Sequence, residues 1–96
     1  MSEIFRLFSG MESELRTNLR TCAEAYAGAR AIELSTVGRL AAGDWRFFDR
    51  IMDGKSFTAR KYDETMRWFS ANWPDALAWP VGVPRPAPVQ QEGAAA

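Results

Sequence analysis

Residues 36 to 58 read TVGRLAAGDWRFFDRIMDGKSFT, and this stretch decides the fold. Ser35 and Thr36 form a pair of the kind that starts helices. Three apolar residues follow at helical spacing: Val37, Leu40 and Ala41. Because glycine weakens a helix interior and is common just beyond a helix end, Gly43 predicts the end of this first short helix.

A second short helix is predicted to follow at once, from Trp45 to Met52. Asp44 stands where a side-chain oxygen would cap its first turn, and Asp53-Gly54 would close it. Phe48 and Ile51 share its inner face as apolar anchors. Two short helices joined by a tight turn, with a third helix packed across them, are typical of a helix-turn-helix DNA reader.

Upstream of this stretch, the spacing predicts an amphipathic helix from Ser13 to Ala29. Its apolar positions recur in steps of three and four: Leu15, Leu19, Cys22, Tyr26 and Ala29. Ser13 would cap the first turn, and Gly28 lies near the end, where helices commonly stop. A separate helical turn is predicted before Ser9-Gly10. It is too short to be stable unless it docks on the body or on another subunit, and its apolar residues are Ile4, Phe5, Leu7 and Phe8.

Downstream, Thr58 is predicted to cap a helix that runs to about Asn72 and ends at Trp73-Pro74. Its inner face holds Tyr62, Met66 and Phe69. The tail over residues 80–96 has four prolines and little that is apolar enough to pack, which predicts an extended, mostly disordered segment. We therefore expect an all-α chain: a compact four- to five-helix bundle with a helix-turn-helix over residues 1–79, followed by a Pro-rich tail.

Composition excludes several classes of function. The 96 residues contain one cysteine and no histidine, so they offer neither an internal disulfide nor the paired ligands of a zinc site, and a reducing cytoplasm is expected. No apolar run approaches the roughly 18 residues that span a bilayer, and Glu3 and Arg6 interrupt the start where a signal peptide would be apolar. Without histidine, a phosphate loop or a nucleophile-base pair, we expect no enzyme, no metal and no cofactor.

Charge is distributed unevenly along the chain. The formal net charge is zero, which by itself argues against nucleic acid as a partner. Residues 16–72, however, hold ten Lys and Arg against seven Asp and Glu. The helical middle of the chain is therefore mildly basic, and the compensating acidic excess lies outside it.

At the opening stretch the chain resembles the lambda repressor and Cro-like helix-turn-helix family. The family's apolar positions match Val37, Ala41, Phe48 and Ile51. Gly38 matches its small position, which lets the two helices cross closely, and Gly54 matches the glycine that closes its recognition helix. The family usually has glycine where Ala42 stands and an apolar residue where Gly43 stands, so the turn departs from the family pattern.

A second likeness lies near the end of the chain. Residues 67–86, RWFSANWPDALAWPVGVPRP, are similar to the end of small phage-type regulators of alphaproteobacteria. Together the two resemblances imply a transcription regulator, nucleoid-associated in the cytoplasm, that binds double-stranded DNA as a symmetric homodimer. A contact with RNA polymerase or another regulatory protein through Trp79 or the aromatic N-terminus is a further possibility.

The same resemblance implies which residues meet the DNA. The outward face of the second short helix would read base edges with Trp45, Arg46, Asp49 and Arg50. Three pairs of residues would contact phosphates: Ser35 and Thr36, Lys55 and Ser56, and Arg60 and Lys61.

Simpler interpretations of these residues stay open. Arg46 and Arg50 would also suit a solvated helix face with Asp49 and Asp53 as ion-pair partners, and Trp45 would suit a core or subunit interface. Arg60 and Lys61 would equally be ordinary surface charge. The rival function is a helical protein-interaction module, such as an antitoxin or adaptor. It would hold a partner through the N-terminus, Trp45 and Phe47.

Overall fold

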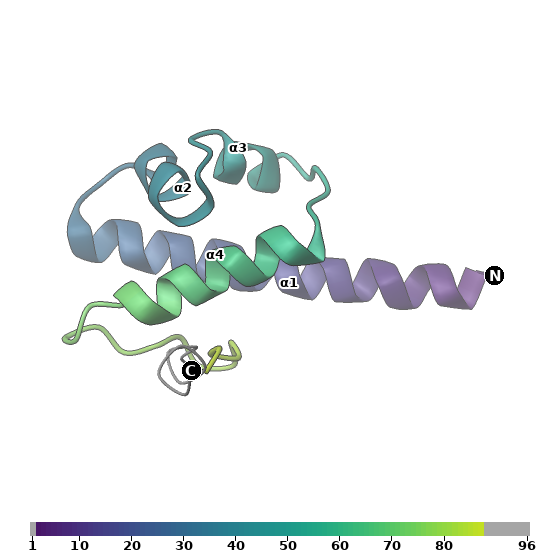
Figure 1. Ribbon diagram of the computed structural model, residues 1–96. Coiled ribbons are helices and arrows are strands. Elements are labelled where there is room, and N and C mark those ends of the chain that lie inside the picture. The colour runs from purple at the N-terminus through teal and green to yellow at the C-terminus, as the bar shows by residue number, and fades with distance from the viewer. Residues whose placement is uncertain (1, 88–96) are drawn as a thin grey trace, which may run out of the picture.

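Four helices form the body of the protein in the computed structural model, which describes residues 2–87, with side chains from residue 10 onward. They are α1 (Ser2–Arg30), α2 (Leu34–Ala42), α3 (Phe47–Met52) and α4 (Ala59–Asn72). Figure 1 shows α4 lying obliquely across α1, with α2 and α3 together on one side of this pair. The described residues contain no strand, so the predicted all-α bundle is confirmed.

Helix α1 is longer than the sequence pattern predicted. It runs unbroken through Ser9 and Gly10, so the separate N-terminal turn was wrong, and Ser13 lies inside the helix instead of capping it. A single glycine costs a helix only about 1 kcal/mol relative to alanine, which the helix-forming residues after it can offset. The N-terminal part of α1 extends past the other helices in Figure 1.

The end of α1 also differs from the prediction. Gly28 remains helical, and the chain leaves the helix at Ala31, whose φ of 58° is left-handed. The Ile32 N–H then donates to the Ala27 carbonyl at 3.0 Å, which closes the helix end. Ala29, expected on the apolar stripe, is exposed, whereas Ala27 is buried.

The core lies where α1, α2, α3 and α4 meet. Its largest fully buried side chains include Leu19, Val37, Phe48, Ile51, Met66 and Phe69. Tyr26 of α1 lies at the centre of an aromatic cluster, with its ring 5.2 Å from Trp68 and 5.9 Å from Phe69 between centroids. Cys22 is buried in the core, and this burial raises the pKa of its thiol to about 12.

Residues 80–87 are not helical, as expected, but they pack against α4. Ser70 Oγ donates to the Pro86 carbonyl at 3.0 Å, and Arg85 Nη2 donates to the Ser70 carbonyl at 2.9 Å. The Arg85 guanidinium also lies over the Trp79 ring at 4.8 Å. The predicted tail therefore divides: Val83, Arg85 and Pro86 contact the body, whereas Val81 is fully exposed and residues 88–96 lie outside the described part.

Candidate nucleic-acid interface

Helices α2 and α3 are joined by a turn that begins at Gly43. Gly43 has a left-handed φ of 69°, which glycine adopts without the steric cost that a Cβ brings. Its N–H donates to Arg39 O at 3.1 Å, and the Asp44 N–H donates to Gly38 O at 3.2 Å, so the end of α2 is capped within the turn. The predicted end of this helix at Gly43 is confirmed.

Gly38 of α2 packs closely against the turn. A Cβ at Gly38 would lie 2.7 Å from the Asp44 carbonyl oxygen and 3.5 Å from a ring carbon of Phe48. A side chain there would force the backbone of the turn to shift. The small position expected from the sequence is therefore a direct contact between α2 and the turn that leads into α3.

Both short helices begin at other residues than predicted. Helix α2 begins at Leu34 with Glu33 at its N-cap, and no side chain caps it, so Ser35 and Thr36 lie in its first turn. Helix α3 begins at Phe47 and not at Trp45, and residues 45 and 46 form a turn before it. Asp44 instead accepts a hydrogen bond from the Arg46 N–H at 3.0 Å, as in an Asx turn, without capping the helix itself.

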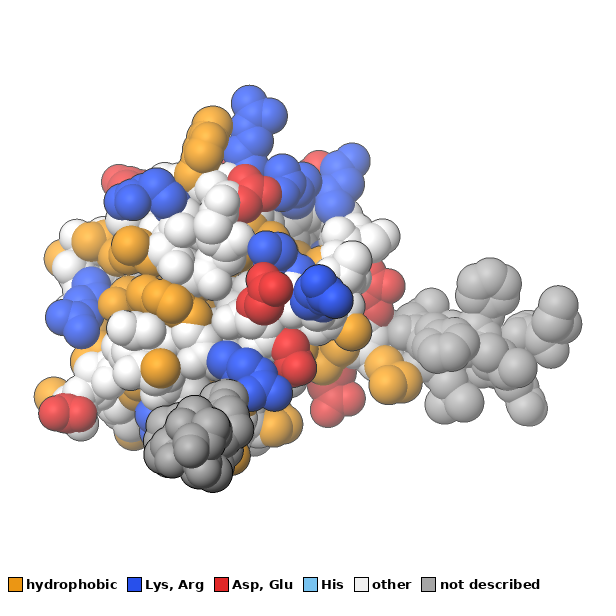
Figure 2. Space-filling view, in the orientation of Figure 1, with side chains coloured by type: hydrophobic (Ala, Val, Ile, Leu, Met, Phe, Trp, Pro, Cys, Tyr) orange, Lys and Arg blue, Asp and Glu red, His pale blue; other side chains and the backbone are white. Residues whose placement is uncertain are grey.

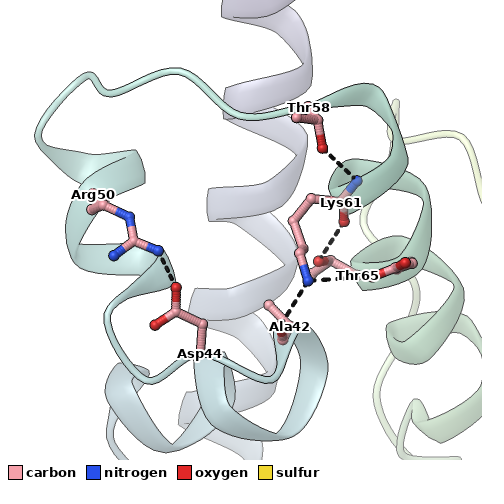
Figure 3. Close-up of polar contacts among 7 residues, drawn as sticks. Ala42, Asp44, Arg50, Thr58, Lys61 and Thr65 are labelled. Carbon is pink, nitrogen blue, oxygen red and sulfur yellow. Dashed lines mark hydrogen bonds and ion pairs between the residues drawn. The ribbon is translucent and has the colours of Figure 1, made fainter.

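Asp44 also forms an ion pair with Arg50 across the first turn of α3 (Figure 3). The hydrogen bond from the Arg46 N–H and the contact with Arg50 together hold the pKa of the Asp44 carboxyl below its usual value. Asp44 is therefore the ion-pair partner of Arg50 within the described residues, and the predicted partners Asp49 and Asp53 are not.

Helix α3 presents two distinct faces. Phe48 and Ile51 are buried, as predicted, and Phe47 is buried too, with only 5% of its surface exposed. The expectation that Phe47 belongs to the surface was wrong, because its ring packs edge-to-face on Phe48 with centroids 5.0 Å apart.

The exposed face of α3 and the turn before it bring together all four predicted base-reading residues. They line one shallow, open hollow with Met52 and Asp53: Trp45, Arg46, Asp49 and Arg50. Trp45 is 56% exposed, and the Arg46 guanidinium lies 5.0 Å from the centre of its ring. Along the upper edge of Figure 2, over α2 and α3, several Lys and Arg side chains lie with Asp and Glu side chains among them.

The structure places the residues predicted to contact phosphates in different surroundings. Ser35, Lys55, Ser56 and Arg60 are exposed, and Thr36 is half-buried. Lys61 is engaged within the protein: its Nζ donates to Ala42 O at 3.1 Å and lies 3.3 Å from a Glu64 carboxylate oxygen (Figure 3). The Lys61 side chain therefore links α4 to the end of α2. At the start of α4, Thr58 Oγ1 accepts a hydrogen bond from the Lys61 N–H at 3.0 Å and caps the helix, as predicted.

Arg16 of α1 is a residue that sequence reasoning missed. Its Nη1 donates to the carbonyls of Ile51 and Lys55, at 2.9 Å in each case, and its Nη2 lies 3.0 Å from Glu12. Because carbonyls at a helix end lack partners within the helix, one guanidinium here holds both the end of α3 and the loop beyond it. The sequence carries no signal for this contact, since Arg16 and Lys55 are 39 positions apart.

Two kinds of feature are absent from the part of the chain that the structure describes. No helix among these residues is long and apolar enough to cross a membrane. Within the same described residues, no three side chains of the usual metal-binding types gather closely enough to hold an ion.

Comparison with protein-family models, curated protein sequences and solved structures found no match to this chain.

Proposed function

We propose that this protein is a DNA-binding transcription regulator that reads the major groove with α3 and the turn before it. The observation that carries the proposal is the division of α3 into two faces. Phe47, Phe48 and Ile51 anchor it in the core, and the residues on its other face line one open hollow. The major groove of B-DNA is wide enough to admit a helix. A short helix that is held on the body by one face can place its exposed face against the bases there.

Arg46 is the strongest candidate for base reading. Its side chain is exposed and has no carboxylate within ion-pair distance among the described residues, whereas Arg50 is held by Asp44. An arginine fork matches the O6 and N7 acceptors of guanine, worth about 1–3 kcal/mol of discrimination against a wrong base. Asp49, exposed on the same face, would accept a hydrogen bond from a cytosine amino group.

Phosphate contacts around α3 would set the register of the protein on the duplex. Ser35 and Thr36 lie in the first turn of α2, where backbone N–H groups are free to donate. Lys55, Ser56 and Arg60 follow α3 and are exposed. Lys61 is a weaker candidate than the sequence suggested, because a phosphate contact would compete with its bond to Ala42.

The wider biological context follows from the same proposal. A six-residue reading helix contacts few base pairs, so a symmetric homodimer on paired half-sites would supply the missing specificity. Such a regulator would work in the cytoplasm, at the nucleoid, without catalysis or a cofactor. It would regulate transcription directly or through a contact with RNA polymerase.

The proposal is tested by recovering bound fragments from random-sequence DNA at moderate salt, with the intact protein and with Arg46→Ala. We expect one enriched motif with the intact protein and its loss with the variant, because the guanine-reading fork is gone. Arg67→Ala is the matched control, since Arg67 is an exposed arginine on α4 outside the site, paired with Asp63 at 3.7 Å. It should keep the motif.

The rival function, a protein-interaction module, predicts different behaviour. DNA affinity that depends on basic side chains falls steeply with salt, whereas an apolar protein interface does not weaken in this way. Burial of Phe47 removes one of the residues that this rival requires at its surface. If no motif is enriched while circular dichroism shows a folded protein, the DNA proposal fails and the rival is favoured.

A further inference from the structure

Trp45 and Arg46 form a single exposed unit. The guanidinium of Arg46 lies over the indole ring of Trp45, with its central carbon 5.0 Å from the ring centre. Stacking of this kind restrains a flexible arginine while its N–H donors stay free at the edge. Because Trp45 is 56% exposed, more than half of the surface of this residue also remains open to a ligand.

The guanidinium carbon of Arg46 and the centre of the Trp45 ring are 5.0 Å apart, farther than two neighbouring bases of one DNA strand. Bases along one strand of B-DNA are about 3.4 Å apart. If the Arg46 fork lies level with one base pair, an indole stacked on the guanidinium lies near the level of the next. The two residues would therefore read adjacent base pairs.

The chemistry of each side chain selects one base. Two acceptors on the same base edge, which an arginine fork requires, are offered in the major groove by guanine through O6 and N7. An indole ring presents an apolar surface, and the apolar group exposed by bases in that groove is the C5 methyl of thymine. Asp49 beside them repels phosphates, which favours bases over the DNA backbone at this face.

The geometry points to a composite reader: Arg46 binds a guanine while Trp45 covers the methyl group of a thymine in the adjacent base pair. This inference rests on the proposed DNA-binding function and adds the content of the half-site. Arg50 does not take the guanine, because Asp44 holds its guanidinium. The half-site thus contains neighbouring thymine and guanine, in an order that the selected motif will reveal.

The test uses base analogues in the motif recovered from random DNA. Deoxyuridine in place of the thymine removes only the methyl group, and 7-deazaguanine removes only the N7 acceptor. For the intact protein we expect a loss of affinity of about fourfold with deoxyuridine, equivalent to one unburied methyl. About tenfold should be lost with 7-deazaguanine, because the bidentate bond is broken.

Variants then assign each effect to its residue. Trp45→Ala should bind thymine and deoxyuridine DNA equally, while keeping its response to 7-deazaguanine; Trp45→Phe should retain part of the methyl response. Met11→Ala is the matched control, since Met11 is 57% exposed on α1, outside the site. It should behave as the intact protein does.

The outcomes separate the two proposals. An enriched motif without adjacent thymine and guanine, or a methyl response that Trp45→Ala retains in full, overturns the composite reader and leaves DNA binding standing. Failure to enrich any motif contradicts the proposed function, and the composite reader with it.

Discussion

At the residue scale, the close contact at Gly38 determines how α2 meets the turn before α3. The neighbouring atom is the carbonyl oxygen of Asp44, which belongs to the backbone and cannot rotate away as a side chain can. Asp44 itself also holds the Arg46 N–H and the Arg50 side chain. One residue in the turn therefore links the packing of the two helices to the position of the proposed reading residues.

We expect Gly38→Ala to lower the free energy of unfolding by about 1–3 kcal/mol, the usual cost of overpacking. The added Cβ would lie 2.7 Å from the Asp44 oxygen, so the turn must shift. The measurement is urea unfolding followed by circular dichroism.

Gly28→Ala is the matched control for this substitution. Gly28 is helical and exposed, and a Cβ added there would meet nothing within 4 Å, so alanine should raise stability by up to about 1 kcal/mol. Equal effects of the two substitutions would contradict the contact at Gly38.

At the scale of elements, α3 depends on α1 for its position. A helix of six residues has little stability of its own, since most of its backbone groups lie in its two end turns. The Arg16 guanidinium supplies donors to the carbonyls at its C-terminal end and in the following loop, and it also lies 5.5 Å from the Phe57 ring centre. Arg16 therefore acts as a positioning residue for the candidate interface.

Removing the guanidinium with Arg16→Ala should lower the free energy of unfolding by about 1.5–3 kcal/mol, because charge-assisted hydrogen bonds to two carbonyls are lost. Hydrogen exchange of the backbone amides at the end of α3 should become faster. The affinity for DNA should fall, while the preferred DNA motif stays the same. Arg20→Ala, an exposed arginine one turn along α1, is the control and should change stability by less than about 0.5 kcal/mol. A changed motif in Arg16→Ala would mean that Arg16 reads bases itself.

At the scale of the whole molecule, residues after α4 complete the aromatic cluster. Trp73 and Trp79 lie 4.8 Å apart between ring centroids, and Trp73 is also 6.1 Å from Tyr26 of α1. The Trp79 Nε1 donates to the Val83 carbonyl at 2.8 Å, which turns the chain back along α4 toward Ser70. Trp73, Trp79 and the segment around Arg85 are therefore part of the fold.

The role of this segment is tested by Arg85→Ala. We expect a loss of about 1–2 kcal/mol of unfolding free energy, because the hydrogen bonds to Ser70 and the stacking on Trp79 disappear together. Tryptophan fluorescence should shift to the red as Trp79 becomes more exposed. Arg67→Ala breaks only an exposed ion pair and should leave the free energy of unfolding and the tryptophan emission almost unchanged. If the two variants behave alike, Arg85 does not hold this segment against α4.

The sequence by itself determined the features that depend on neighbouring residues. The end of α2 at Gly43, the cap at Thr58 and the end of α4 at Asn72 all follow from local backbone and capping preferences, and all agree with the structure. The buried face of α3 through Phe48 and Ile51 follows from spacing alone. These features predicted the all-α fold and the grouping of Trp45, Arg46, Asp49 and Arg50 around one open hollow.

Only the tertiary structure decided the features that join distant parts of the chain. Burial of Phe47 depends on what lies across from α3, and the engagement of Lys61 depends on where α2 ends relative to α4. The contact of Arg16 with Lys55 and the packing of residues 80–87 likewise link segments at least 15 positions apart. Periodicity and capping are local, so they cannot show which carbonyl a distant side chain will reach once the helices have packed.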